Sequence, residues 1–200
     1  MPAKLDCRGL ACPAPVLQTK QVIERDNPGE ITVIVDNGAA KENISRFLGS
    51  QRFSVSVEQS GPDFHINGKR VDGAAPNDFA IGPSAGLEKQ KIMVMIATDR
   101  MGFGDDELGK KLVVSFINTL KEMGDELWRL VFVNNGVKLT VSGSGLAETL
   151  RTYEKEGVTI LVCGTCLNHF NLLDKKQVGE TTNMLDIVTA MQLADKVISI

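Results

Sequence analysis

Two prolines, Pro13 and Pro15, lie close behind Cys12 and restrict how this part of the 200-residue chain can fold. Proline fits an α-helix only within its first turn, where the backbone N–H has no intrahelical partner. The pattern therefore predicts a helix in which Pro13 and Pro15 take the first and third positions and Cys12 is the N-cap. Apolar residues then recur at helical spacing until Asn27-Pro28-Gly29 ends the run.

This arrangement makes Cys12 a candidate nucleophile. A sulfur at a helix N-terminus lies at the positive end of the helix dipole, which stabilises a thiolate. The prolines remove two amide donors and leave the Ala14 N–H as the main donor for the sulfur. A buried and inert Cys12 is the alternative, because burial is the usual state of cysteines outside disulfides.

The first 70 residues predict a small sheet covered by two helices. Strands are indicated by β-branched or alternating apolar residues, and the last two strands flank a tight turn. The expected strands cover residues 4–7, 31–35, 53–57 and 63–66. One helix follows Cys12 and the other follows Asp36-Asn37-Gly38. The resulting βαβαββ order predicts a two-layer sandwich with both helices on one face of the sheet.

The string from Arg8 to Pro15, with Cys-Pro-x-Pro after Gly-Leu-x, resembles the signature of the TusA/SirA family of small sulfur carriers. The resemblance covers residues 1–70, and the predicted fold agrees with the fold of that family. It implies that Cys12 carries sulfur between proteins as a persulfide. Arg8 could attract this anionic persulfide or a partner carboxylate, and it fits equally well as an ordinary surface residue. It also implies two kinds of partner: a cysteine desulfurase or another donor, and a downstream acceptor protein.

Residues 71–89 interrupt the pattern of strands and helices. Small and turn-forming residues dominate this stretch, and no periodicity runs through it. The composition is typical of a linker. We therefore expect two domains, over residues 1–70 and 90–200.

The second domain alternates strands with helices. The expected strands cover residues 92–96, 128–133, 158–162 and 196–200. Such alternation predicts a mostly parallel, doubly wound α/β sheet. Functional groups in these sheets gather at the carboxyl ends of the strands. Cys163-Gly164-Thr165-Cys166 follows the third strand and is therefore expected at that edge.

The cysteines at this strand end, and the order of the strands, resemble the DsrE/DsrF family of sulfur-transfer proteins. The reactive cysteine of that family corresponds in position to Cys163. The fusion of both domains, with Cys-Gly-x-Cys followed by Thr182-Asn183-Met184, is similar to the YedF-type proteins implicated in selenium metabolism. The resemblance implies a relay of sulfur or selenium between Cys12 and Cys163 or Cys166, held covalently and without a cofactor. It also implies a homo-oligomer formed through the C-terminal domain.

Several alternatives remain open. Cys163 and Cys166 could instead form a dithiol redox pair, and the chain could be a regulatory or scaffold protein that transfers nothing. A zinc site would need four ligands, with His169 as a third candidate beside the cysteine pair. His169 could also tune a thiol or serve only in packing. Gly102-Phe103-Gly104 and the glycines near Ser144 resemble phosphate loops, but they lack the Walker lysine and the full dinucleotide spacing.

Composition narrows the classes of function. The net charge is −3 and the pI is about 5.5, which argues against nucleic-acid binding. No apolar run approaches the roughly 18 residues needed to span a bilayer, and the segment Met1–Asp6 has no signal-peptide core. With four cysteines and no export signal, the sequence predicts a cytoplasmic protein with reduced thiols.

Overall fold

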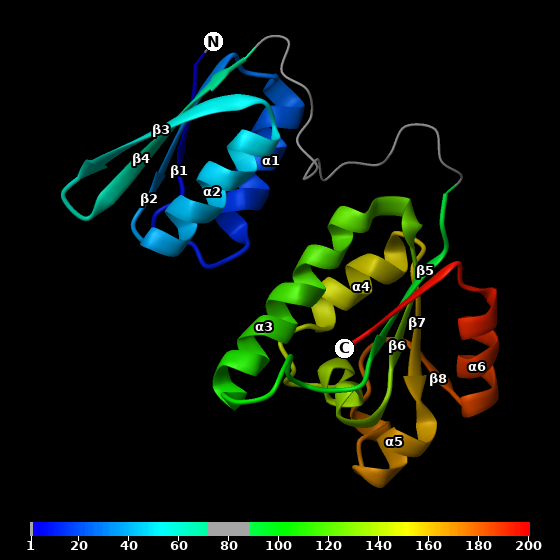
Figure 1. Cartoon of the computed structure of the whole chain (residues 1–200). Helices are drawn as coiled ribbons and strands as arrows, with labels where there is room; N and C mark the ends of the chain where they lie inside the picture. The colour runs from blue at the N-terminus through cyan, green and yellow to red at the C-terminus, as the bar shows by residue number, and fades with distance from the viewer. Residues whose placement is uncertain (1, 72–88) are drawn as a thin grey trace. The chain divides into compact units, whose positions relative to one another are not determined.

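The computed structural model describes residues 2–71 and 89–200 (Figure 1). The chain divides into two compact units, Met1–Pro83 and Ser84–Ile200. The expected linker over residues 71–89 lies, apart from its end residues, outside the described part. In that part, no helix has the length and apolar character needed to cross a membrane.

The first unit is a four-stranded sheet with two helices on one face (Figure 1). Its sheet has the order β1-β2-β4-β3, in which β1 and β2 are parallel and the other neighbours are antiparallel. The elements are β1 (Ala3–Asp6), α1 (Ala14–Asp26), β2 (Glu30–Val35), α2 (Gly38–Ser50), β3 (Phe53–Ser60) and β4 (Asp63–Arg70). The predicted βαβαββ two-layer sandwich is confirmed.

Apolar residues on the inner face of this sheet form the core of the first unit. Val33 and Val35 of β2 and Ile66 of β4 are fully buried, as are Ile44 and Leu48 of α2. The alternation of β2 and the i, i+4 spacing of α2 bring these side chains to a shared interface.

The second unit is a five-stranded sheet of order β8-β7-β6-β5-β9, and every neighbouring pair is parallel. Its strands are β5 (Ile92–Ile96), β6 (Leu127–Phe132), β7 (Thr159–Cys163), β8 (Glu180–Thr182) and β9 (Lys196–Ser199). Its helices are α3 (Asp106–Thr119), η1 (Leu120–Glu126), η2 (Asn134–Thr140), α4 (Ala147–Lys155), α5 (Gly164–His169), η3 (Leu173–Lys175) and α6 (Met184–Leu193).

Helices cover both faces of this sheet. Figure 1 shows α3 and α4 on one face and α6 on the other. The predicted doubly wound parallel sheet is therefore confirmed. Strands β5, β6 and β7 are nearly all apolar because both of their faces are covered.

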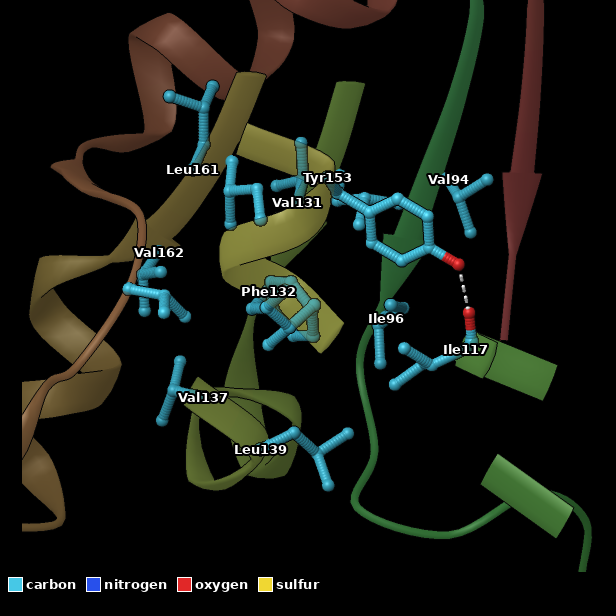
Figure 2. Close-up of a cluster of buried hydrophobic side chains, with 14 of the residues drawn as sticks. Val94, Ile96, Ile117, Val131, Phe132, Val137, Leu139, Tyr153, Leu161 and Val162 are labelled. Atoms are coloured by element: carbon cyan, nitrogen blue, oxygen red, sulfur yellow. Dashed lines mark hydrogen bonds between the residues drawn. The ribbon is translucent and has the colours of Figure 1, made fainter. Parts of the chain in front are cut away.

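The core of the second unit joins residues from all three central strands to the neighbouring helices (Figure 2). Val94, Val131 and Phe132 are fully buried. Tyr153 of α4 reaches across this core, and its hydroxyl donates to the carbonyl oxygen of Ile117 at 2.5 Å. This hydrogen bond fixes α4 against the end of α3.

The carboxyl ends of the parallel strands meet at one edge of the sheet, and the segment after β6 is held firmly there. The Val133 N–H donates to the Ile96 carbonyl oxygen at 3.0 Å, and the Gly136 N–H donates to the Val133 carbonyl oxygen at 2.9 Å. A Cβ atom at Gly136 would lie 2.0 Å from the Ile96 oxygen, so only glycine fits. This packing fixes the backbone at Asn134, beside the end of β7.

Candidate thiol sites

Cys12 is exposed and lies directly before α1. The helix begins at Ala14, with Pro13 as its N-cap and Pro15 in its second position. The prediction that Cys12 is the N-cap is therefore wrong by one residue. The prediction for the Ala14 N–H is also wrong, because this group donates to the Ala11 carbonyl oxygen at 2.9 Å. A carbonyl oxygen is a better acceptor than a thiol, so the turn that precedes the helix takes the donor.

A small open pocket of about 60 Å³ lies beside Cys12. It is lined by residues at the starts of α1 and α2, most of them apolar: Leu10, Cys12, Pro13, Pro15, Val16, Asn37, Ala39, Ala40 and Asn43. The Asn37 side chain caps α2 by accepting the Ala40 N–H at 2.8 Å. The thiol of Cys12 thus borders a mostly apolar pocket where α1 and α2 begin.

Arg8 stabilises the loop that carries Cys12. Its guanidinium donates to Asp6 at 2.8 Å and to Asp63 at 3.0 Å. The hydrogen bonds from Arg8 lower the pKa of Asp6 to about 2, and the Gly9 N–H lowers the pKa of Asp36 in the same way. Because Arg8 is paired with two carboxylates, the geometry supports a role in holding the loop that carries Cys12. Attraction of an anionic persulfide by Arg8 stays a prediction.

The second thiol site is at the carboxyl end of β7. Cys163 is the last residue of this strand and its side chain is 4% exposed. Cys166 lies in the first turn of α5 and is partly exposed. Cys163 is also the N-cap of α5, so both cysteines lie at the start of this helix. All four cysteines of the chain lie in the described residues, and none of them forms a disulfide.

A backbone donor also points at this pair. The Asn134 N–H donates to Cys166 Sγ at 3.1 Å. Burial raises the pKa of the Cys166 thiol, the neighbouring Cys163 thiol raises it further, and the Asn134 N–H acts in the opposite direction. Asn134 could not be recognised from the sequence as a donor, because any residue except proline can donate from its backbone. The residues Asn134-Asn135-Gly136, which are typical of a turn, were the signal that could have placed an amide near the β7 edge.

The structure places His169 at the far end of α5 from Cys163. Its ring contacts the Phe170 ring edge-on, with centroids 4.9 Å apart, and Lys138 lies 4.5 Å from the centroid of the same phenyl ring. Within residues 2–71 and 89–200, His, Cys, Asp and Glu side chains form no group of three that could hold a metal ion. The zinc alternative therefore has no support, and the contact shown for His169 is a packing contact.

Comparisons with known proteins match both units. Residues 3–69 match the model of the family described as Sulfurtransferase TusA, and residues 93–200 match the DsrE/DsrF-like family. A protein of Methanocaldococcus jannaschii named as a sulfur carrier is 45% identical over 65 residues, which is 32% of this chain and 87% of that protein.

Two solved structures also match at low sequence identity. A SirA-like protein from Desulfitobacterium hafniense is 20% identical with a TM-score of 0.31, covering 34% of this chain and 95% of its own. The YchN protein from E. coli is 19% identical with a TM-score of 0.43, covering 56% of this chain and 99% of its own. The two predicted family resemblances are confirmed by the family models. The chain belongs to the TusA sulfurtransferase family over residues 3–69 and to the DsrE/DsrF-like family over residues 93–200.

Proposed function

We propose that this protein carries sulfane sulfur as a persulfide on Cys12 and passes it to the Cys163–Cys166 pair. The observation that carries the proposal is the exposed Cys12 thiol beside the mostly apolar pocket, in a domain that belongs to a family of sulfurtransferases. A carrier thiol must be reached by a partner protein, and exposure meets that need. The two thiols at the end of β7 and the start of α5 supply a second site in the same chain.

The loading step needs no cofactor. The Cys12 thiolate attacks the terminal sulfur of a donor persulfide, and the S–S bond of the donor breaks. The donor cysteine leaves as a thiolate and takes up a proton, while Cys12 becomes a persulfide. A cysteine desulfurase is the class of donor that we propose, and a sulfur-accepting protein is the downstream partner. We place this exchange in the cytoplasm, where thiols stay reduced.

Selenium metabolism is the setting that we propose for this carrier. The support is the resemblance of the fused domains, with Cys163-Gly164-Thr165-Cys166 and Thr182-Asn183-Met184, to YedF-type proteins. Selenium bonds to a cysteine thiolate as sulfur does, so the same thiols serve for both elements. Loading the chain from glutathione perselenide and from glutathione persulfide in parallel separates the two, because each donor transfers its terminal atom to the cysteine thiolate and releases glutathione thiolate.

We also propose self-association through the second unit. Four apolar side chains of α6 are exposed on one helix, and exposed apolar groups that lie together are typical of interaction surfaces. They are Met184, Leu185, Val188 and Leu193, at 64%, 75%, 43% and 56% exposure. The size of the isolated second unit in solution tests this part of the proposal.

The carrier function is tested by the mass of the full chain after incubation with a cysteine desulfurase and cysteine. We expect the wild-type chain to gain sulfur, and we expect Cys12→Ser to lose this gain because serine forms no persulfide. Cys7→Ala is the matched control, since Cys7 is buried with 1% exposure and should leave loading unchanged. Equal loading of the wild-type chain and of Cys12→Ser would contradict the proposal.

A dithiol redox role is the second candidate, and the position of Cys163 and Cys166 together at the start of α5 favours it. In that case the pair would exchange electrons with thiols such as glutathione, and no persulfide would be needed on Cys12. A regulatory or scaffold role predicts neither reaction. Titrating the pair in glutathione redox buffers beside the loading assay separates the three functions.

A further inference from the structure

The two thiols at the end of β7 differ in access. Cys163 belongs to the hydrophobic core of the second unit and is 4% exposed. Cys166 only packs against that core and is partly exposed. A thiol that attacks a persulfide on another protein or domain must reach a sulfur that comes from outside. Access therefore favours Cys166 over Cys163 for the first contact with an incoming sulfur.

A second observation points to the same thiol. The Asn134 N–H donates to Cys166 Sγ at 3.1 Å. The segment that holds this amide is anchored by the hydrogen bond from Val133 to Ile96 and by the close packing of Gly136 on Ile96. A fixed donor to Sγ stabilises the negative charge of the Cys166 thiolate, which is the attacking form. Cys166 is thus the sulfur of the pair for which the structure shows a backbone donor.

We propose that Cys166 is the thiol that accepts sulfane sulfur and that Cys163 is the resolving thiol. This order is the reverse of the order suggested by position in the sequence, where Cys163 corresponds to the reactive cysteine of the DsrE/DsrF family. The assignment rests on the proposed function for its source of sulfur. It is carried by the exposure of Cys166 and by the donor at Asn134.

The two steps balance in atoms and electrons. In the first step, the Cys166 thiolate attacks the terminal sulfur of a donor persulfide. The S–S bond of the donor breaks, the donor cysteine leaves as a thiolate, and Cys166 becomes a persulfide. In the second step, the Cys163 thiolate attacks Cys166 Sγ, and the bond from Cys166 to the sulfane sulfur breaks. Hydrosulfide leaves, the sulfane sulfur has gained two electrons, and the two cysteines have lost them by forming a disulfide.

The position of both cysteines at the start of α5 supports the second step, because Cys163 is the N-cap of this helix and Cys166 lies in its first turn. Burial of Cys163 is compatible with this role, since its partner lies inside the same protein. A buried resolving thiol also meets only the sulfur that Cys166 has already accepted.

The test uses the full chain with Cys12→Ala, treated with glutathione persulfide, quenched by alkylation and mapped by peptide mass. In this background we expect Cys163→Ser to accumulate a persulfide on Cys166, because nothing resolves it. We expect Cys166→Ser to show a loss of loading at Cys163. With the pair intact, hydrosulfide and the Cys163–Cys166 disulfide should form together. Cys7→Ala in the same background is the control and should behave as the parent chain does.

The assignment is overturned if Cys166→Ser accumulates a persulfide on Cys163, or if both serine variants load equally. Because Cys12 is absent, these outcomes do not depend on whether Cys12 carries sulfur. Failure of Cys12 to load in the wild-type chain would instead overturn the proposed carrier function alone. A short pulse of iodoacetamide on the native wild-type chain gives a readout that needs no variant at position 163. It should modify Cys166 before Cys163, and the opposite order would also overturn the assignment.

Discussion

The Tyr153 hydroxyl makes two hydrogen bonds that join α4 to the end of α3. It donates to the Ile117 carbonyl oxygen at 2.5 Å (Figure 2). It also accepts from the Lys121 N–H at 3.0 Å. The side chain is 2% exposed, and its burial raises the pKa of Tyr153 from 10.0 to about 12. A single residue therefore supplies both a buried donor and a buried acceptor at this helix junction.

We expect Tyr153→Phe to lower the free energy of unfolding of the second unit by about 1–3 kcal/mol, because two backbone groups lose their partner. The measurement is chemical denaturation of the full chain. Thr152→Ala is the control, since the Thr152 hydroxyl makes an exposed hydrogen bond within α4 and should matter little. A loss no larger than that of the control would contradict this account.

The raised pKa of Tyr153 also predicts a dependence on pH. The folded value of about 12 lies above the ordinary value of 10.0, so the folded state holds the phenol proton more tightly. This contribution to stability is complete below pH 10 and is lost as the pH rises toward 12. Tyr153→Phe should remove this part of the alkaline destabilisation.

At the scale of residues, the sequence identified the thiols but not their surroundings. Cys12, Cys163 and Cys166 stand out because sulfur chemistry requires a specific side chain. The donor at Asn134 could not be recognised, because a backbone N–H looks the same in every residue except proline. The start of α1 was predicted one residue too early, since the competition for the Ala14 N–H is decided by the turn at Ala11.

At the scale of elements, the packing of η2 depends on a single residue, Gly136. Gly136 lies against the Ile96 carbonyl oxygen, where a Cβ atom would come within 2.0 Å. We expect Gly136→Ala to destabilise the second unit by about 1–3 kcal/mol, as overpacking usually does. The shift of the backbone should also slow the reaction of Cys166 with glutathione persulfide, because the Asn134 donor moves with η2. Unfolding curves and persulfide formation in the Cys12→Ala/Cys163→Ser chain measure the two effects.

The control for this substitution is Gly49→Ala in α2, where an added Cβ meets nothing within 4 Å. Alanine is preferred over glycine inside a helix, so this variant should stabilise the first unit by up to about 1 kcal/mol. If Gly136→Ala is as well tolerated as Gly49→Ala, the close approach to Ile96 is not a constraint.

Elements rich in β-branched and apolar residues were predicted well from the sequence. The strand expected over residues 92–96 is β5, and the strand expected over 31–35 is β2 with one further residue. The short strand β8 and the short helix α5 were not predicted. Glu180-Thr181-Thr182 has no apolar pattern, and it is a strand because β7 offers a parallel edge to pair with. Strand pairing of this kind depends on the tertiary fold and cannot be recognised from the local sequence.

At the scale of the whole molecule, each unit has a hydrophobic core of its own. We therefore expect separate fragments of residues 1–71 and 89–200 to fold, each with one cooperative thermal transition. Calorimetry of both fragments and of the full chain measures this. The full chain should show the transitions of the two fragments, and an unfolded first fragment would contradict the assignment of two independent cores.

The same fragments locate any self-association. Sedimentation should show an oligomer for residues 89–200, because the exposed apolar side chains of α6 lie in that fragment. Leu185→Glu should return the fragment to a monomer, since a charge would have to be buried at the contact. An oligomer formed only by residues 1–71 would be inconsistent with this location.

The hydrogen bond from Asn134 to Cys166 also bears on how this site can change over evolutionary time. Because the donor is a backbone amide, substitutions at position 134 alter the surface of the protein without removing the donor. Asn134 has φ of 48°, however, and this left-handed conformation is tolerated mainly by glycine, asparagine and aspartate. The backbone conformation at position 134, and not the chemistry of the side chain, therefore limits which residues can replace Asn134. Glycine could therefore replace Asn134 during evolution while the backbone donor to Cys166 is kept.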